Sequence, residues 1–239
     1  MRTSGTPISA LFVNCSLKRT AADSHTRRLM QRVAGVMRSE GVEVEILHAL
    51  DHDIAVGMAK DLSRETGGHD DWPSIQKKVE GADILVIGTP IWLGAVSSVA
   101  ALVIERIYAY SADMNDAGQY IYYGKVAGCV VTGNEDGVKT CARDVLYALQ
   151  HVGYTIPPQA DCGWIGEVGP GPSYGDQSEG DGDVPVGYDN EFTNRNATIM
   201  AWNLVHMARL LRDNGGIPAV GNQPDHWREV ANAADQIVD

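Results

Sequence analysis

Apolar segments alternate with segments of helical periodicity along this chain, and this alternation constrains the fold more than any other feature. Residues 8–14, 82–90 and 125–133 are almost continuously apolar, which is typical of strands that are buried on both faces of a parallel sheet. Residues 42–46 alternate apolar side chains with Glu, and residues 159–164 form a weaker apolar run. These two segments are therefore predicted to be edge strands.

Helical periodicity fills most of the intervals between these strands. Helices are predicted near residues 29–37, 98–110 and 138–152, and a fourth follows the last strand at about 192–211. Strands that alternate with helices predict a doubly wound α/β fold, in which helices cover both faces of a parallel sheet. The five-stranded order 2-1-3-4-5 places strands 2 and 5 at the edges, where the alternating and the weak strands belong.

Length and composition fit one α/β domain. The chain has 239 residues, of which 44% are hydrophobic, so we expect a single domain over 1–239, with its core at about 8–212 and a loosely attached tail at 213–239 that Trp227 partly docks. The net charge of −12 argues against a nucleic-acid partner. Residues 84–104 carry no charge, but glycine, proline and serine interrupt them, so we expect a strand, a turn and a helix start instead of a membrane span.

The four cysteines lack the spacing of a zinc site or a redox motif. We interpret them as small buried residues in a reducing compartment, and since no signal peptide is visible, a cytoplasmic location is expected. Two further segments, at 51–53 and 69–71, combine His with Asp. They resemble metal ligands in composition only, so no metal site is predicted.

The first strand leads into a segment rich in hydroxyl groups, residues 14–26, which includes Ser16, Lys18, Ser24 and Thr26. A helix begins near Ser24, and the start of a helix offers free backbone N–H groups and a partial positive charge. Together these groups favour a phosphate site. The basic side chains in and directly after the segment are Lys18, Arg19, Arg27 and Arg28, opposed only by Asp23. A simple helix cap with a solvated basic face explains the same residues equally well.

Two more loops leave the carboxyl ends of predicted central strands. Residues 89–97 place Trp92 directly after a buried strand, where an indole can stack on a flat aromatic ligand or can plug the end of the sheet. Gly94 lets the backbone approach such a ligand closely. Residues 132–138 carry two glycines around three polar residues, which suits either a ligand contact or an ordinary turn before a helix. In this class of sheet, ligands bind where such strand ends meet.

Taken together, the three loops make the chain resemble the flavodoxin-like NAD(P)H-dependent FMN reductases and quinone reductases. The segment CSLKRTAADSHTRRLM is similar to the phosphate loop of that family. GTPIWLGAVSSVAALVIERI is similar to its flavin loop and following helix, and VVTGNEDG to its third loop. The resemblance covers about residues 8–164, while the irregular segments 51–72 and 166–190 lie beyond the family's motifs.

The resemblance implies a role for each of these positions. The FMN phosphate would be held by Ser16, Lys18, Ser24, His25 and Thr26. The isoalloxazine would be lined by Pro90, Ile91, Trp92, Leu93 and Gly94, and packed along its other side by Thr132, Gly133, Asn134, Glu135, Asp136 and Gly137. Because the flavin carries the hydride chemistry, no catalytic side chain is expected.

The resemblance also implies an activity. NAD(P)H would donate a hydride to bound FMN, and a quinone, a free flavin or a similar small molecule would accept it. The family resemblance further suggests a homodimer or homotetramer. A flavodoxin-type electron carrier is the alternative, since it would also be acidic and hold FMN. A signalling receiver with the same sheet would need an Asp where this chain has Thr89, which argues against that class.

Residues 166–190 follow the last predicted strand, and we expect them to cover the site or a subunit interface.

Overall fold

The computed structural model describes residues 6–169, 171–178 and 184–235. The parts of the predicted domain, of the 166–190 segment and of the tail that fall at 1–5, 170, 179–183 and 236–239 lie outside these residues. The strands are β1 (Ser9–Asn14), β2 (Glu43–His48), β3 (Ile84–Trp92), β4 (Ala95–Val96), β5 (Val126–Gly133) and β6 (Asp161–Ile165). The α-helices are α1 (His25–Ser39), α2 (Trp72–Gly81), α3 (Ser98–Tyr108), α4 (Val138–Val152), α5 (Glu191–Asp213) and α6 (Trp227–Asp235).

The strands form a parallel sheet in the order β2-β1-β3-β5-β6, and only β4 pairs outside this path, antiparallel to β3. Because β4 is a two-residue addition, the order of the other strands is the predicted 2-1-3-4-5, which is confirmed. The exposed Glu43 and Glu45 lie on β2, and β6 closes the opposite edge, so both predicted edge strands are also correct.

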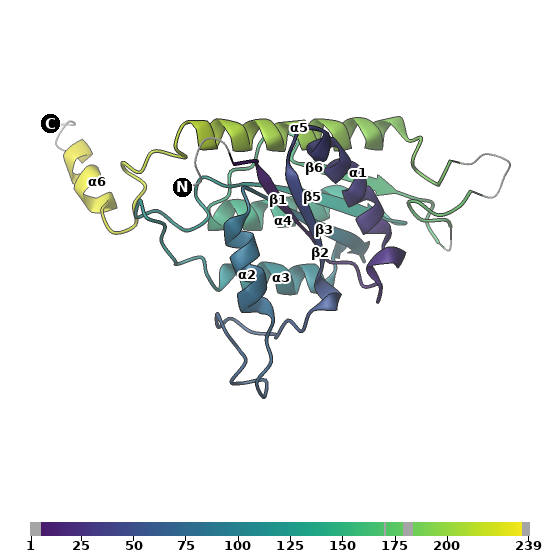
Figure 1. The fold of residues 1–239 in the computed structure, drawn as a ribbon, viewed down its shortest axis with the longest axis horizontal. Coiled ribbons are helices and arrows are strands. Elements are labelled where there is room, and N and C mark those ends of the chain that lie inside the picture. The colour runs from purple at the N-terminus through teal and green to yellow at the C-terminus, as the bar shows by residue number, and fades with distance from the viewer. Residues whose placement is uncertain (1–5, 170, 179–183, 236–239) are drawn as a thin grey trace.

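Helices cover both faces of the sheet and divide the core into two layers (Figure 1). One layer packs α1 and α5 against Phe12, Val86 and Val130, and the other packs α2, α3 and α4 against Leu11 and Leu85. Both layers contain alternate residues of the same strands, because successive side chains of a strand point to opposite faces. This explains why the central strands are apolar without interruption.

A single glycine allows α1 to approach the centre of the sheet. A Cβ atom at Gly88 in β3 would lie only 2.3 Å from the Met30 sulfur of α1, whose side chain is fully buried. Gly88 pairs with Asn14 at the carboxyl end of β1. The glycine therefore fixes how closely the start of α1 sits over the β1 and β3 ends.

The tail differs from its prediction. Residues 213–235 contain a helix, α6, which stands away from the sheet (Figure 1). Trp227 is 53% exposed, and its part in docking the tail stays a prediction. The segment before α6 contacts the domain, because the Gln119 amide donates to the carbonyls of Ile217 and Pro218 at 3.1 and 3.3 Å. Among the described residues, no helix is long and apolar enough to cross a membrane.

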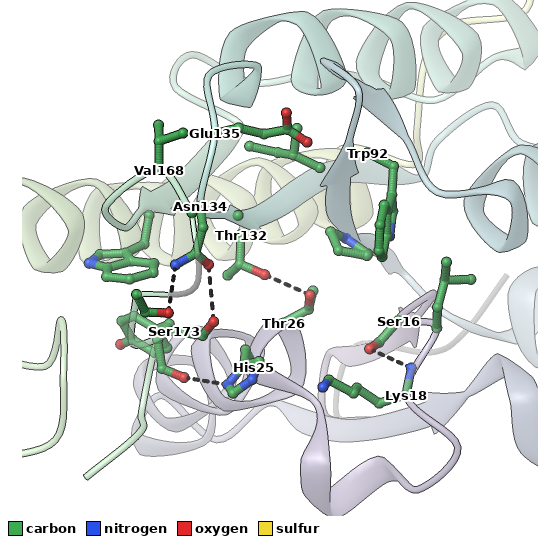
Figure 2. A pocket seen from close by; sticks show the side chains of 18 residues that line it. Ser16, Lys18, His25, Thr26, Trp92, Thr132, Asn134, Glu135, Val168 and Ser173 are labelled. Carbon is green, nitrogen blue, oxygen red and sulfur yellow. Dashed lines mark hydrogen bonds between the residues drawn. The ribbon is translucent and has the colours of Figure 1, made fainter. Parts of the chain in front are cut away.

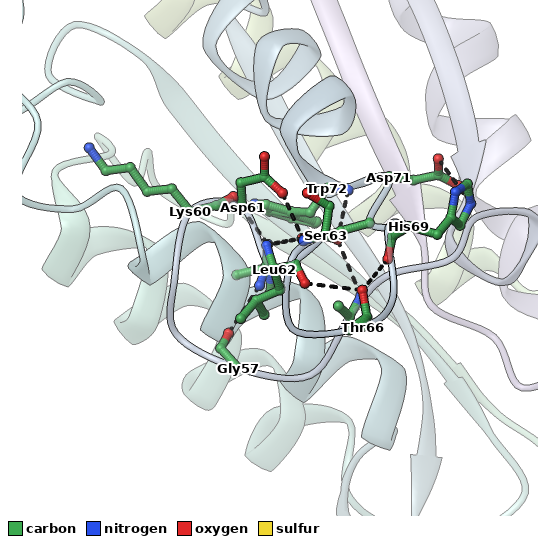
Figure 3. A network of polar contacts seen from close by, with 12 residues as sticks. Gly57, Lys60, Asp61, Leu62, Ser63, Thr66, His69, Asp71 and Trp72 are labelled. Carbon is green, nitrogen blue, oxygen red and sulfur yellow. Dashed lines mark hydrogen bonds and ion pairs between the residues drawn. The ribbon is translucent and has the colours of Figure 1, made fainter.

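A network of polar contacts organises the segment between β2 and α2 (Figure 3), and it includes a buried ion pair. Arg106 of α3 donates to Asp70 at 2.7 Å and to the carbonyls of Gly57 and Lys60 at 3.3 and 3.2 Å. Both charged side chains are 0% exposed. Asp70 also accepts from the backbone of Leu62 and of Trp72. The segment that was predicted as irregular is thus a folded loop, tied to α3 from its middle.

The Arg106–Asp70 pair predicts a large loss of stability when one partner is removed. Arg106→Met keeps most of the apolar stem but leaves the Asp70 carboxylate buried without its cation. We expect the free energy of unfolding to fall by about 3–5 kcal/mol in a denaturant titration. Lys78→Met is the matched control, because Lys78 pairs with Glu45 on the surface and should cost less than about 1 kcal/mol. Equal losses in the two variants would contradict the account.

Burial predicts that the cysteines are unreactive in the folded protein. All four are free and buried, and burial raises the pKa of each thiol, to about 11 for Cys141 and further for Cys15, Cys129 and Cys162. A raised pKa leaves little nucleophilic thiolate at neutral pH. A thiol reagent such as DTNB should therefore label almost none of them at pH 8 and all four after unfolding. Rapid labelling of the native protein would contradict this placement.

Candidate functional site

A cavity of about 830 Å³ opens at the carboxyl ends of the central strands (Figure 2). Its wall is made by the loop after β1 and the start of α1, by the carboxyl ends of β3, β5 and β6, and by the segments that follow β5 and β6. The lining residues are Ser16, Leu17, Lys18, His25, Thr26, Pro90, Ile91, Trp92, Thr132, Gly133, Asn134, Glu135, Trp164, Val168, Gly169, Gly171, Ser173 and Tyr174. The cavity thus joins the three loops that the sequence singled out.

The loop after β1 forms one side of the cavity with hydroxyl groups and one cation. Ser16 is buried, and its hydroxyl accepts a bond from the backbone of Lys18 at 3.2 Å. The Thr26 hydroxyl reaches across the floor to that of Thr132 at 2.7 Å (Figure 2). Lys18 is exposed at the rim. These groups, two hydroxyls and an ammonium, are the donors that a phosphate monoester requires.

Ser24 has a different position from the one predicted. It is fully buried, it does not line the cavity, and its hydroxyl accepts the backbone N–H of Arg27 at 3.1 Å, which makes it the N-cap of α1. The first N–H groups of a helix have no acceptor within the helix. Because the Ser24 hydroxyl accepts the backbone N–H of Arg27, the backbone N–H groups of His25 and Thr26 remain available to an anion at the positive end of the helix.

The loop after β3 is a tight β-hairpin. β3 extends to Trp92, where Trp92 pairs with Ala95, and the two turn residues have positive φ, 51° at Leu93 and 75° at Gly94. Trp92 lines the cavity and remains 53% exposed, so the indole is free to contact a ligand and does not plug the sheet. Leu93 is 92% exposed and lies outside the lining, as does Gly94.

The loop after β5 is fixed against this hairpin. A Cβ atom at Gly137 would lie 3.0 Å from the Cα of Gly94, so the glycines bring two backbones together and do not serve a ligand directly. The Glu135 carboxylate accepts the backbone N–H of Leu93 at 3.1 Å. Asp136 and Gly137 do not line the cavity, whereas Thr132, Gly133, Asn134 and Glu135 do.

The segment after β6 makes the remaining wall, and two groups of contacts hold it. The Asn134 amide donates to the carbonyls of Gly171 and Pro172 at 3.3 and 3.1 Å, and the Ser173 hydroxyl donates back to Asn134 at 3.0 Å (Figure 2). At the start of α1, His25 lies 3.1 Å from the carbonyl of Tyr174. His25 and Asn134, predicted as flavin contacts, therefore use side-chain groups to hold this wall.

Arg28 adds an ion pair to the same attachment, with its guanidinium 3.2 Å from Asp176. Beneath the wall, Tyr174 packs edge-on against Trp164, with ring centroids 5.7 Å apart. Burial raises the pKa of Tyr174 to about 12, so its hydroxyl stays neutral. Part of the segment that was expected to cover the site lines the cavity, namely Val168, Gly169, Gly171, Ser173 and Tyr174.

No residue of this wall was predicted to contact a ligand. Leu17, Trp164, Val168, Gly169, Gly171, Ser173 and Tyr174 line the cavity in addition to the predicted residues. One signal was present: Trp164 stands near the carboxyl end of the last strand, as Trp92 does in β3. Leu17 lies in the loop after β1, and the others belong to the segment after β6, which has no periodicity and whose fold depends on residues far away in the chain.

Comparison with known proteins agrees with this geometry. Residues 8–163 match the family of NADPH-dependent FMN reductases. The chain is 35% identical, over 211 residues, to 8-demethyl-8-aminoriboflavin-5'-phosphate synthase of Streptomyces davaonensis, covering 86% of this chain and 79% of that protein. It is also 55% identical over 205 residues to a Mycobacterium bovis protein named divalent metal cation transporter MntH, but spans only 29% of its length, against 86% of this chain.

Solved structures show the same architecture. RosB, with the bound intermediate 8-demethyl-8-formylriboflavin-5'-phosphate, superimposes with a TM-score of 0.78 at 33% identity, covering 97% of this chain and 88% of RosB. An apo NADH:FMN oxidoreductase, EmoB, superimposes with a TM-score of 0.53 at 14% identity over 90% and 94% of the two chains, which shows the fold alone. The names FMN and NADPH in the family description confirm the predicted flavin and electron donor at the level of the family. The chain belongs to the NADPH-dependent FMN reductase family, with a flavodoxin-like fold.

Proposed function

We propose that this protein is an oxidoreductase that binds FMN and transfers a hydride from NAD(P)H through it to a quinone, a free flavin or a similar small acceptor. The observation that carries the proposal is one cavity with two chemically different parts. One part offers hydroxyls, a cation and a helix start, and the other offers a broad apolar and aromatic surface. A phosphate joined to a large planar ring needs both.

The chain's residues would bind the flavin as follows. Ser16, Lys18, Thr26 and the first N–H groups of α1 would hold the phosphate, since each donates hydrogen bonds and the last two lie at a positive helix end. Trp92 on one side and Trp164 on another would contact the ring and keep water from it. The donor set fits one phosphate monoester, because Lys18 is the single Lys or Arg among the described lining residues.

Bound FMN would supply the redox chemistry by accepting the hydride and passing it to the acceptor. The protein would contribute position and shielding. The wall formed by Val168, Gly169, Gly171, Ser173 and Tyr174 would close one side of the part of the cavity that holds the ring. The half-exposed Trp92 would leave another side accessible to a donor or acceptor. An electron carrier of flavodoxin type needs only a bound flavin, so the additional wall favours an enzyme over the carrier.

A second function is favoured by two likenesses: to RosB, which holds 8-demethyl-8-formylriboflavin-5'-phosphate as a bound intermediate, and to the Streptomyces protein, which is named as a synthase of 8-demethyl-8-aminoriboflavin-5'-phosphate. If this chain acts in that way, FMN would be its substrate instead of its cofactor. The two functions share the cavity and differ in the fate of the flavin. Mass spectrometry of the flavin recovered after turnover distinguishes them, because a cofactor returns with the mass of FMN.

The redox assay tests the first function directly. The purified full chain, loaded with FMN, should oxidise NADPH or NADH in the presence of a quinone or of free FMN, and the flavin should be recovered unchanged. Bound FMN without any oxidation of NAD(P)H would support the carrier, and a flavin of altered mass would support the second function.

The phosphate cradle predicts how affinity responds to one hydroxyl group. Thr26→Val keeps the shape of the side chain but removes its hydroxyl, and we expect FMN to bind about ten- to a hundredfold more weakly, the cost of a hydrogen bond to a charged group. Riboflavin, which lacks the phosphate, should bind as it does to the wild type. Ser39→Ala is the control, because Ser39 lies at the far, exposed end of the same helix. Unchanged FMN affinity in Thr26→Val would place the phosphate elsewhere.

A further inference from the structure

Two buried polar side chains lie behind the phosphate side of the cavity without lining it. Asn14 is the last residue of β1 and His48 the last residue of β2, and the two are paired in the sheet. Asn14 is 0% exposed and His48 is 2% exposed. Burying an amide and an imidazole costs free energy unless each is hydrogen-bonded, so their partners show what they do.

The partners of His48 indicate which ring nitrogen carries the hydrogen. Its Nε2 atom lies 2.9 Å from the backbone carbonyl of Lys18, and a carbonyl can only accept, so Nε2 carries the hydrogen. In a neutral ring, Nδ1 is then an acceptor, and the Asn14 amide donates to it at 2.9 Å. One imidazole thus connects the end of β1 to the backbone of the phosphate loop.

Asn14 continues the connection to the helix. Its Oδ1 atom accepts the Ser24 hydroxyl at 3.2 Å and the backbone N–H of Ser16 at 3.3 Å. The Ser24 hydroxyl in turn accepts the N–H of Arg27. Hydrogen bonds therefore run in one direction through the side chains of Ser24, Asn14 and His48, from the first turn of α1 to the carbonyl of Lys18.

This series of hydrogen bonds joins the two ends of the loop that carries the proposed phosphate donors. The Ser16 N–H is fixed by Asn14, the Lys18 carbonyl by His48 and the start of α1 by Ser24. Hydrogen bonds aligned in one direction polarise one another, so the series holds the loop more firmly than its separate bonds would. A loop that is already arranged loses less conformational entropy when a ligand binds.

We propose that His48, acting through Asn14, is a positioning residue that holds the loop in its phosphate-binding geometry before the ligand arrives. The proposal rests on the proposed function, because it assumes that the phosphate binds at this loop. His48 is not a catalytic residue, since it does not line the cavity. Its replacement should therefore change the recognition of the phosphate and leave the recognition of the ring unchanged.

Two conservative variants separate the two bonds of His48. His48→Gln can place an amide N–H near the Nε2 position, which keeps the donor to Lys18 but removes the ring nitrogen that Asn14 requires. His48→Asn places an amide near the Nδ1 position and is too short to reach Lys18. We expect each variant to lose about tenfold or more in affinity for FMN, one broken link being enough to free the loop, while its affinity for riboflavin changes less than about twofold.

The control is His151→Gln, because His151 is exposed near the end of α4 and its ring contacts Tyr108 and Tyr147, away from the cavity. FMN and riboflavin affinities should both equal those of the wild type. Flavin fluorescence measures the FMN and riboflavin affinities of the wild type and of the three variants, and circular dichroism shows whether each protein is folded. A folded His48 variant that keeps the wild-type preference for FMN, or that loses affinity for both flavins equally, overturns the positioning role.

A wild type that binds FMN and riboflavin equally well would instead refute the phosphate assignment, and the positioning role with it. A measurement on the unmodified protein covers the case in which a variant does not fold. A long-range ¹H–¹⁵N correlation spectrum reports which imidazole nitrogen carries the hydrogen. At a pH where the ring is neutral, we expect His48 with the hydrogen on Nε2 before FMN is added, and a hydrogen on Nδ1 would overturn the proposal.

Discussion

The parallel pairing of β1 with β3 is the constraint on which the rest of the structure depends. From β1 the chain passes through α1 on one face, and from β3 it passes through α3 on the other, so the two connections diverge at the carboxyl ends of neighbouring strands. Divergence at this point leaves a crevice that no helix fills. Every feature of the site follows from it: the loop after β1, the start of α1 and the hairpin after β3 all face the same opening (Figure 2).

Close backbone approaches then decide the shape of that opening. Because Gly88 has no side chain, Met30 of α1 packs directly against β3. This close packing brings the positive end of α1 to the crevice. Gly137 and Gly94 bring the β5 loop against the β3 hairpin. The segment after β6 is held by Asn134 and by Arg28, one from each side of the cavity. The wall is therefore held by side chains such as Asn134 and Arg28. Side chains that hold the wall are not available to contact the ligand.

The sheet order and the two edge strands could be predicted from the sequence because they depend on local periodicity. α2 received no residue assignment, since it begins with Trp72 and a proline directly after a loop whose fold depends on Arg106, a residue of α3. The hairpin of β3 and β4 was also missed, because the first residue of its turn is Leu93, which has a positive φ although leucine does not favour one.

Within the site, hydroxyl-rich and glycine-rich loops could be recognised, but the task of each side chain could not. Ser24 and Thr26 are two residues apart and look equivalent in the sequence, yet one caps the helix and the other lines the cavity. His48 ends a strand that periodicity identifies only as an edge, and its partner Asn14 lies 34 residues earlier. Such roles depend on contacts between distant segments, which a single sequence does not reveal.

The central claim is that one cavity at the β1 and β3 ends binds the phosphate and the ring of a single flavin. A crystal structure of the protein with FMN tests it most directly. We expect the phosphate between Ser16, Thr26 and the first N–H groups of α1, with the ring between Trp92 and Trp164. A phosphate bound outside this loop, or a ring outside the cavity, would contradict the account.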